Sequence, residues 1–185
     1  MARKNEVGGM TQTGREPIQT QMVDVGEKSI TLRTAVASGK IRLEKTVLEA
    51  VQTFRVPKGN VLEVARIAGI MAAKKTDSIL PLCHPLPLEF LTLRFEIEND
   101  GVRVKAEVKT HAKTGVEMEA LVAVSVACLT IYDMCKSLPE GQSASIESVM
   151  LEEKNGGSGG HYLRGTSNYP LKKETDGAIF RTDIE

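Results

Sequence analysis

The clearest pattern in the chain is a strict alternation of apolar and polar residues between Leu91 and Val108. Leu, Phe and Ile alternate with Thr, Arg and Glu in the first half, and Val and Ala alternate with Arg, Lys and Glu in the second. A period of two indicates half-buried strands, and the intervening Asn99-Asp100-Gly101 predicts a tight turn. The segment is therefore predicted to be a β-hairpin with one apolar and one charged face.

Three other segments space their apolar residues as helices do. They are Leu43–Phe54, a segment that begins after the N-cap candidate Asn60 and runs to about Lys75, and an Ala/Val-rich segment from about Val116 to Leu138. In the second of these helices one face carries the apolar residues Val61, Val64, Ala65, Ala68, Met71 and Ala72.

Two further strands are predicted, Thr31–Ser38 with a turn at Gly39, and Ser145–Glu153. The prolines in Pro81–Pro87 exclude a helix and favour a rigid, extended loop. The resulting order of strand, helix, hairpin, helix and strand is that of a ferredoxin-like βαββαβ domain. We therefore expect an α+β fold, in which helices cover one face of an antiparallel sheet and the Leu43–Phe54 helix is an insertion.

Composition places this domain between two polar tails. We expect a flexible arm over residues 1–21, a single domain over 22–160 and a polar tail over 161–185. The 24 basic and 24 acidic side chains balance, aromatic residues are 4% of the chain and Trp is absent, which disfavours nucleic-acid binding. The longest apolar run, residues 120–132, is too short to span a bilayer. Three cysteines and no apolar leader favour a cytoplasmic protein.

The long apolar helix carries charges at both ends, which helices buried only for packing rarely do. Asp133 and Lys136 are three residues apart and share a face, so they are either a proton-transfer pair or an ordinary salt bridge. Glu117 and Glu119 form a second acidic group near the start of the helix. Glu119 and Asp133 lie ~21 Å apart along the axis. If both act on one small substrate, they must come from different subunits.

Other candidate residues lie outside that helix. His84 in the proline-rich loop is either an acid/base or phosphate contact, or a structural histidine. Its neighbour Cys83 is expected to point the other way, which disfavours a Cys–His nucleophile, and no paired ligand spacing indicates a zinc site. Lys58, before a helix N-terminus, and Lys154, before the glycine run 156–160, are phosphate candidates. A solvated lysine and a flexible linker are the alternatives.

Several longer motifs resemble the cyclic pyranopterin monophosphate synthase family, also called molybdenum cofactor biosynthesis protein C. They run in the family's order from about Met22 to Gly160. The matching segments are Met22–Val25, Lys58–Val61, Ala65–Ile70, Pro81–Pro85, Lys113–Leu121 and Tyr132–Lys136. So many motifs in register make a chance resemblance very unlikely.

The resemblance implies a lyase that converts 3′,8-cyclo-7,8-dihydro-GTP into cyclic pyranopterin monophosphate and releases pyrophosphate. It also implies a ferredoxin-like homohexamer, a trimer of dimers with sites at the interface. By motif, Asp133 is the catalytic acid/base and Lys136 its partner, with His84 a further catalytic candidate. The resemblance implies that the substrate-binding residues are Leu82, Cys83, His84, Glu117, Met118 and Glu119. Lys58 and Lys154 are expected to bind the substrate's phosphates.

The sequence departs from the family after the last predicted strand. The family often has a second lysine in this loop, whereas here Lys154 is followed by Asn155 and the run Gly156–Gly160. No cofactor is expected, although Mg²⁺ with the triphosphate stays open. Two alternatives come from other classes of protein, an RNA-binding module and a purely structural assembly protein. An RNA-binding module needs exposed aromatic residues on its strands, whereas Phe95 falls on the apolar face.

Overall fold

The computed structural model describes residues 20–165. The predicted arm and tail lie largely outside these residues, so the boundaries of the domain stay predictions. The described elements, in chain order, are β1 (Thr31–Arg42), α1 (Lys45–Gln52), α2 (Val61–Ala73), α3 (Thr76–Ile79), β2 (Phe90–Glu98), β3 (Gly101–Ala112), α4 (Glu117–Cys135), a 3₁₀ turn (Gly141–Ser143), β4 (Ser145–Asn155) and β5 (Tyr162–Leu163).

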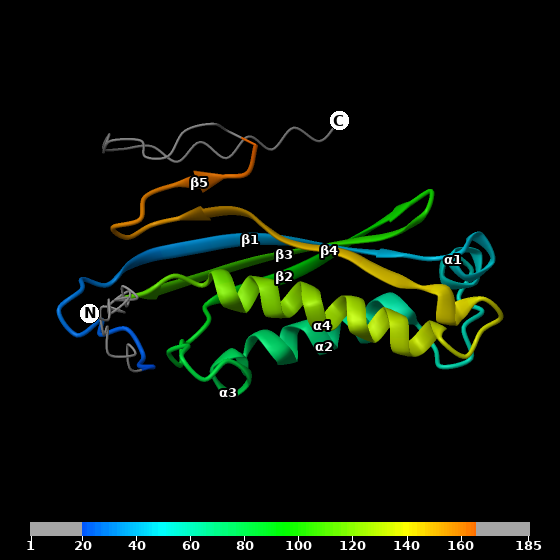
Figure 1. Cartoon of the computed structure of the whole chain (residues 1–185), viewed down its shortest axis with the longest axis horizontal. Coiled ribbons are helices and arrows are strands. Elements are labelled where there is room, and N and C mark those ends of the chain that lie inside the picture. The colour runs from blue at the N-terminus through cyan, green and yellow to red at the C-terminus, as the bar shows by residue number, and fades with distance from the viewer. Residues whose placement is uncertain (1–19, 166–185) are drawn as a thin grey trace, which may run out of the picture.

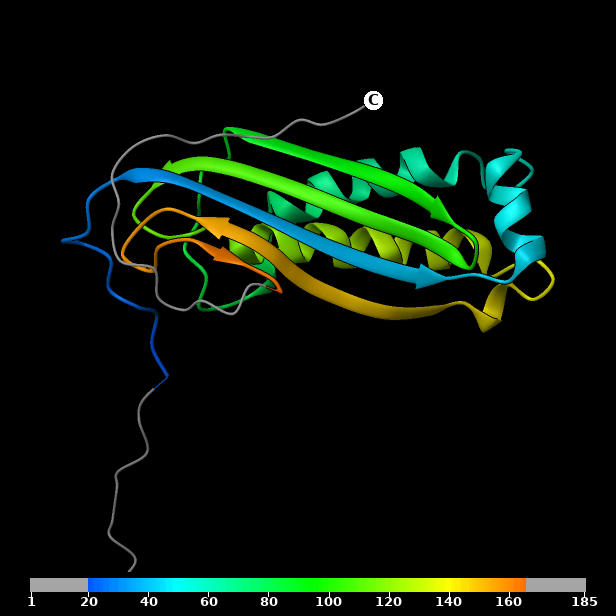
Figure 2. The same ribbon diagram turned by 90° about the horizontal axis from the view of Figure 1, so that it is seen from above.

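The strands form one antiparallel sheet in the order β2-β3-β1-β4-β5. Figures 1 and 2 show α2 and α4 lying side by side on one face of this sheet, with α1 at one end. The first four strands have the ferredoxin-like arrangement, and α1 is inserted between β1 and α2. The predicted fold class, the hairpin and the inserted helix are confirmed.

A close approach between α4 and β1 corrects the turn predicted at Gly39. The strand runs straight through this residue, because β1 extends from Thr31 to Arg42. A Cβ atom at position 39 would lie 3.0 Å from Sγ of Cys128 and 3.3 Å from Cβ of Val124. The glycine therefore makes room for the helix rather than for a turn.

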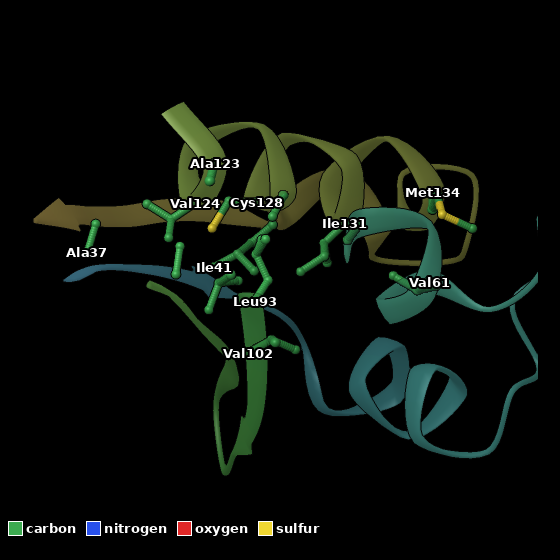
Figure 3. Packing of buried hydrophobic residues seen from close by; sticks show 14 of the residues in the cluster. Ala37, Ile41, Val61, Leu93, Val102, Ala123, Val124, Cys128, Ile131 and Met134 are labelled. Atoms are coloured by element: carbon green, nitrogen blue, oxygen red, sulfur yellow. The ribbon is translucent and has the colours of Figure 1, made fainter. Parts of the chain in front are cut away.

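The core lies between the sheet and the two long helices. Ile41, Leu93 and Val102 from the sheet face Val124 and other apolar residues of α4 (Figure 3). A Cβ at Gly69 of α2 would come within 2.8 Å of the Ala123 carbonyl oxygen of α4, so the backbones of the two helices pack directly against each other. Because half of the α4 residues in its most apolar stretch are buried inside the domain, α4 has the character of a core helix, although its length and composition would suit a membrane span.

The apolar face of α2 is buried only in part. Val61, Ala65 and Ala72 are buried, but Val64 and Met71 are exposed. Asn60 caps the helix as predicted, since its side chain accepts a hydrogen bond from the Glu63 amide at 3.2 Å. The helix turns its buried side, including Gly69, toward the sheet and α4, and the exposed apolar residues form a stripe on its outer side.

The structure also contains two short elements that the sequence did not reveal. The one-turn helix α3 follows α2. The strand β5, which lies within the predicted tail, pairs with Glu153 and Lys154 of β4 at the edge of the sheet. Elements of four and two residues are too short to show a periodicity.

Candidate active site

One group of predicted residues surrounds an open pocket of about 310 Å³ beside the N-terminal end of α4. We call it the acidic pocket, because two glutamates are among its walls. It is lined by Val23, Leu82, Cys83, His84, Leu86, Thr114, Gly115, Glu117, Met118 and Glu119. Six of the residues predicted to bind substrate line this pocket, Leu82, Cys83, His84, Glu117, Met118 and Glu119, whereas their roles stay predictions.

Two loops build this pocket. The proline-rich loop between α3 and β2 supplies one wall, and the short connection from β3 to α4 supplies the other. Gly115 in the second loop lies directly under the Glu117 carboxylate, because a Cβ there would lie 1.8 Å from Oε2 of that side chain. The glycine lets the first carboxylate of α4 fold back over the loop.

Glu119 is the most unusual ionisable group of the pocket. It is only 4% exposed. Burial raises the pKa of its carboxyl to about 7, and the nearby charges of Glu117 and Asp77 act in the same direction. A hydrogen bond from its own backbone amide acts against this rise, because it stabilises the charged carboxylate and lowers the pKa. The carboxyl is therefore poised to change its charge near neutral pH.

Glu117 has a different environment. Its Oε1 atom lies 3.0 Å from Nζ of Lys154, which reaches α4 from β4. Lys154, predicted as a phosphate lysine, thus neutralises a pocket carboxylate in the structure. The adjoining loop packs on Arg33, because a Cβ at Gly157 would lie 1.8 Å from the guanidinium of that arginine.

The cysteine and histidine of the rigid loop do not form a nucleophile–base pair. Both line the pocket, but no hydrogen bond between Cys83 and His84 occurs in the described structure. Burial, followed by the charges of Glu119 and Asp77, raises the pKa of the Cys83 thiol. A raised pKa disfavours the thiolate that nucleophilic catalysis requires.

The second group of predicted residues lies at the opposite, C-terminal end of α4. Lys58, Asp133 and Lys136 form what we call the basic cluster. Nζ of Lys58 donates to both Oδ2 and the backbone carbonyl of Asp133 at 2.8 Å, and Nζ of Lys136 lies 2.7 Å from Oδ1. These hydrogen bonds, that of Lys136 foremost, lower the pKa of Asp133 to about 2. Asp133 in turn raises the pKa of Lys136.

This cluster is exposed and carries a net positive charge, which suits it to bind phosphate groups. The contact between Lys58 and Asp133 joins residues 75 positions apart, and no local pattern in the chain indicates it. Lys58 reaches the cluster from the turn before α2, where Gly59 has a φ of +104°.

The two groups do not meet within one chain. They occupy opposite ends of the 19-residue helix α4, which Figure 1 shows as one uninterrupted helix. Sequence reasoning missed four pocket residues, Val23, Leu86, Thr114 and Gly115, although Val23, Thr114 and Gly115 lie inside quoted motifs. Within residues 20–165, no three His, Cys, Asp or Glu side chains are arranged to hold a metal ion. Mg²⁺ that enters with the triphosphate needs no such group, so that expectation stays a prediction.

Comparisons with known proteins agree with this arrangement of motifs. Curated relatives named cyclic pyranopterin monophosphate synthase include one from Nostoc sp., 53% identical over 149 residues, which covers 78% of this chain and 86% of the relative. The Bacillus subtilis relative of the same name is 46% identical over 160 residues, covering 84% and 93%. Residues 22–157 match the model of the MoaC family. The chain belongs to the MoaC family.

Proposed function

We propose that the chain is a cyclic pyranopterin monophosphate synthase, a lyase of molybdenum cofactor biosynthesis. It converts 3′,8-cyclo-7,8-dihydro-GTP into cyclic pyranopterin monophosphate and releases pyrophosphate by general acid/base catalysis. The observation that carries this proposal is the pairing of an acidic pocket with a basic cluster that contains an aspartate held between two lysines. The names of the curated relatives support it.

The acidic pocket suits the base of this substrate. A guanine-type ring presents adjacent N–H donors along one edge, and a buried carboxylate accepts such donors well. Glu119 is such a carboxylate, and the apolar side chains of Leu82, Leu86 and Met118 provide surface for the ring itself. His84 lines the same pocket, and in this proposal it exchanges a proton with the bound molecule.

The basic cluster suits the triphosphate and the proton transfers. In the free protein Asp133 is a poor base, because two lysines hold its pKa near 2. Phosphate oxygens that bind Lys58 and Lys136 would compete for those hydrogen bonds. The pKa of Asp133 then rises, and its carboxylate becomes a better base only when substrate is present. Lys136 is left as the protonated partner next to the phosphates.

Because the two groups lie at opposite ends of α4, we propose that each site combines the acidic pocket of one subunit with the basic cluster of another. An antiparallel crossing of two α4 helices about a twofold axis would bring these groups together twice in each dimer. The outer surface of the helix layer is apolar enough to pack against a second copy. Its exposed residues include Val64, Ile67, Met71, Met118 and Leu129.

The finer expectations complete the proposal. The dimers assemble into a homohexamer, the enzyme acts in the cytoplasm, and it needs neither a resident cofactor nor a nucleic-acid or membrane partner. Mg²⁺ would enter, if at all, with the triphosphate. An RNA-binding role is disfavoured because the Arg66 guanidinium lies 5.1 Å from the centre of the half-buried Phe95 ring, on the side of the helices.

The direct test is incubation of the purified protein with 3′,8-cyclo-7,8-dihydro-GTP, followed by measurement of released pyrophosphate and of the pterin product. Turnover by the wild type, with loss of turnover in Lys136→Ala, supports the proposal. A protein that assembles but releases no pyrophosphate in the presence or absence of Mg²⁺ would be a structural assembly protein instead. The matched control is Lys45→Ala, an exposed lysine of α1 outside both groups.

A further inference from the structure

One wall of the acidic pocket comes from a segment that has no role in the proposed mechanism. Val23 lines the pocket, although every other lining residue belongs to the proline-rich loop or to the β3–α4 region. It precedes β1, in an irregular segment that Figure 1 places at the same end of the molecule as α3. The Val23 side chain is 66% exposed, so the pocket leaves most of it in contact with water.

Few contacts hold this segment in place. Among residues 20–30, every residue except Val25 is exposed. Oδ1 of Asp24 accepts a hydrogen bond from the Gly26 amide at 2.7 Å, and the Lys28 amide donates to the Val25 carbonyl at 3.1 Å, which closes a local turn. Within the described structure, the one side-chain hydrogen bond that ties this turn to another part of the chain runs from Nζ of Lys113 to the Gly26 carbonyl, at 2.5 Å.

Lys113 links the turn to the pocket itself. It is the residue between β3 and the lining residues Thr114 and Gly115, and its own carbonyl accepts a hydrogen bond from the half-buried end of Arg33 at 3.1 Å. The base of the pocket is therefore anchored to the sheet, and the Val23 wall is attached to that base through a single lysine.

We propose that Val23 is a specificity-determining residue that covers the ring of the bound substrate, and that Lys113 is the positioning residue that holds it there. This rests on the proposed function, because the ring is that of the dihydro-GTP precursor. An apolar side chain that is largely hydrated in the free protein gains by covering a ring, since apolar surface leaves water. The chemical step at the basic cluster does not involve this wall.

The kinetic test uses two exposed aliphatic residues of the same segment. Val23→Ala should raise KM roughly tenfold with kcat nearly unchanged, because only the methyl contacts to the ring are lost. Ile30→Ala is the matched control, since Ile30 is 64% exposed but does not line the pocket. Lys113→Met should raise KM in the same way, and Lys113→Arg, which can still donate to the Gly26 carbonyl, should recover most of the loss. Equal KM values for the two alanine variants would overturn the proposal.

Hydrogen exchange separates this inference from the proposed function. With the precursor added to the wild type, the amides of residues 23–26 should exchange more slowly than in the free protein, while those near Ile30 should change little. Protection without turnover would retain the Val23 wall and reject the proposed reaction. Turnover without protection, together with an unaltered KM in Val23→Ala, would reject the wall and retain the reaction.

Discussion

The two ends of α4 place the same kinds of side chain in opposite electrostatic states. At the N-terminal end, Glu119 is buried among other acidic groups, and its pKa rises to about 7. At the C-terminal end, Asp133 is exposed between Lys58 and Lys136, and its pKa falls to about 2. Two carboxyls on one helix thus differ in pKa by several units because of burial at one end and positive partners at the other. This difference supports the roles proposed above, recognition for Glu119 and phosphate-dependent proton transfer for Asp133.

The largest expected effect comes from removing the charge pair at the basic end. Asp133→Asn and Lys136→Ala should each lower kcat by about 10²- to 10⁴-fold, the usual contribution of a general acid or base. Circular dichroism and gel filtration should show an unchanged fold and assembly, because both side chains are exposed. If either variant keeps more than about a tenth of the wild-type kcat, the pair is only a surface salt bridge.

A mixing experiment tests whether the two ends act together across an interface. His84→Ala and Lys136→Ala should each be nearly inactive, but after reassembly of an equal mixture about a quarter of wild-type activity should return. Half of the dimers are then mixed, and half of the sites in those dimers are intact. Mixtures that exchange subunits, as shown by mass-labelled chains, and yet stay inactive would show that each site is built within one chain.

Lys58 tests whether the basic cluster binds the triphosphate. Lys58→Ala should raise KM roughly tenfold, because one charge-assisted hydrogen bond to the triphosphate is lost. It should also raise the pKa of Asp133, since one of its two lysine partners is removed. Steady-state kinetics, with Lys45→Ala as the control, give KM, and an NMR titration of the Asp133 carboxyl below pH 5 gives its pKa. An unchanged KM would leave Lys58 as a structural partner of Asp133.

The smallest effect concerns stability at the acidic end. The folded state holds the Glu119 proton up to about pH 7, while the unfolded state loses it near the ordinary value of 4.5. The unfolded state therefore binds fewer protons in that window, and stability falls by about 1–3 kcal/mol as the pH rises from 4.5 to 7. Urea unfolding at pH 5 and pH 8 should show this loss in the wild type and less of it in Glu119→Gln. The same pH dependence in Glu119→Gln as in the exposed control Glu44→Gln would contradict it.

Local patterns in the sequence were enough to predict the architecture, but they could not predict which surfaces meet. The alternation in the hairpin and the N-cap at Asn60 depend on neighbouring residues, and both are confirmed. A turn at Gly39 is the wrong prediction because the residues that Gly39 contacts, Val124 and Cys128, lie far away in the sequence. The buried side of α2 likewise depends on where α4 lies, so Val64 and Met71 could not be assigned from periodicity alone.

The same limit applies to the candidate site. The motifs indicated the individual residues, and the spacing of Glu119 and Asp133 already showed that they are far apart. The lysines that pair with the acidic groups of α4 come from distant segments, since Lys154 contacts Glu117 and Lys58 contacts Asp133. Burial of Glu119 is also a property of the assembled fold, because a glutamate in the first turn of a helix is ordinarily solvated.

The continuous helix between the two groups has a consequence for how the chain can change in length. A single residue inserted into α4 would move the basic cluster ~1.5 Å along the axis and rotate it by about 100° relative to the acidic pocket. Gly39 and Gly69, which fit closely against Val124 and Ala123, leave no room for the helix to absorb that rotation. Insertions and deletions should therefore accumulate in the loop after Gly156 and at the tip of the β2–β3 hairpin, while the number of residues in α4 stays constant.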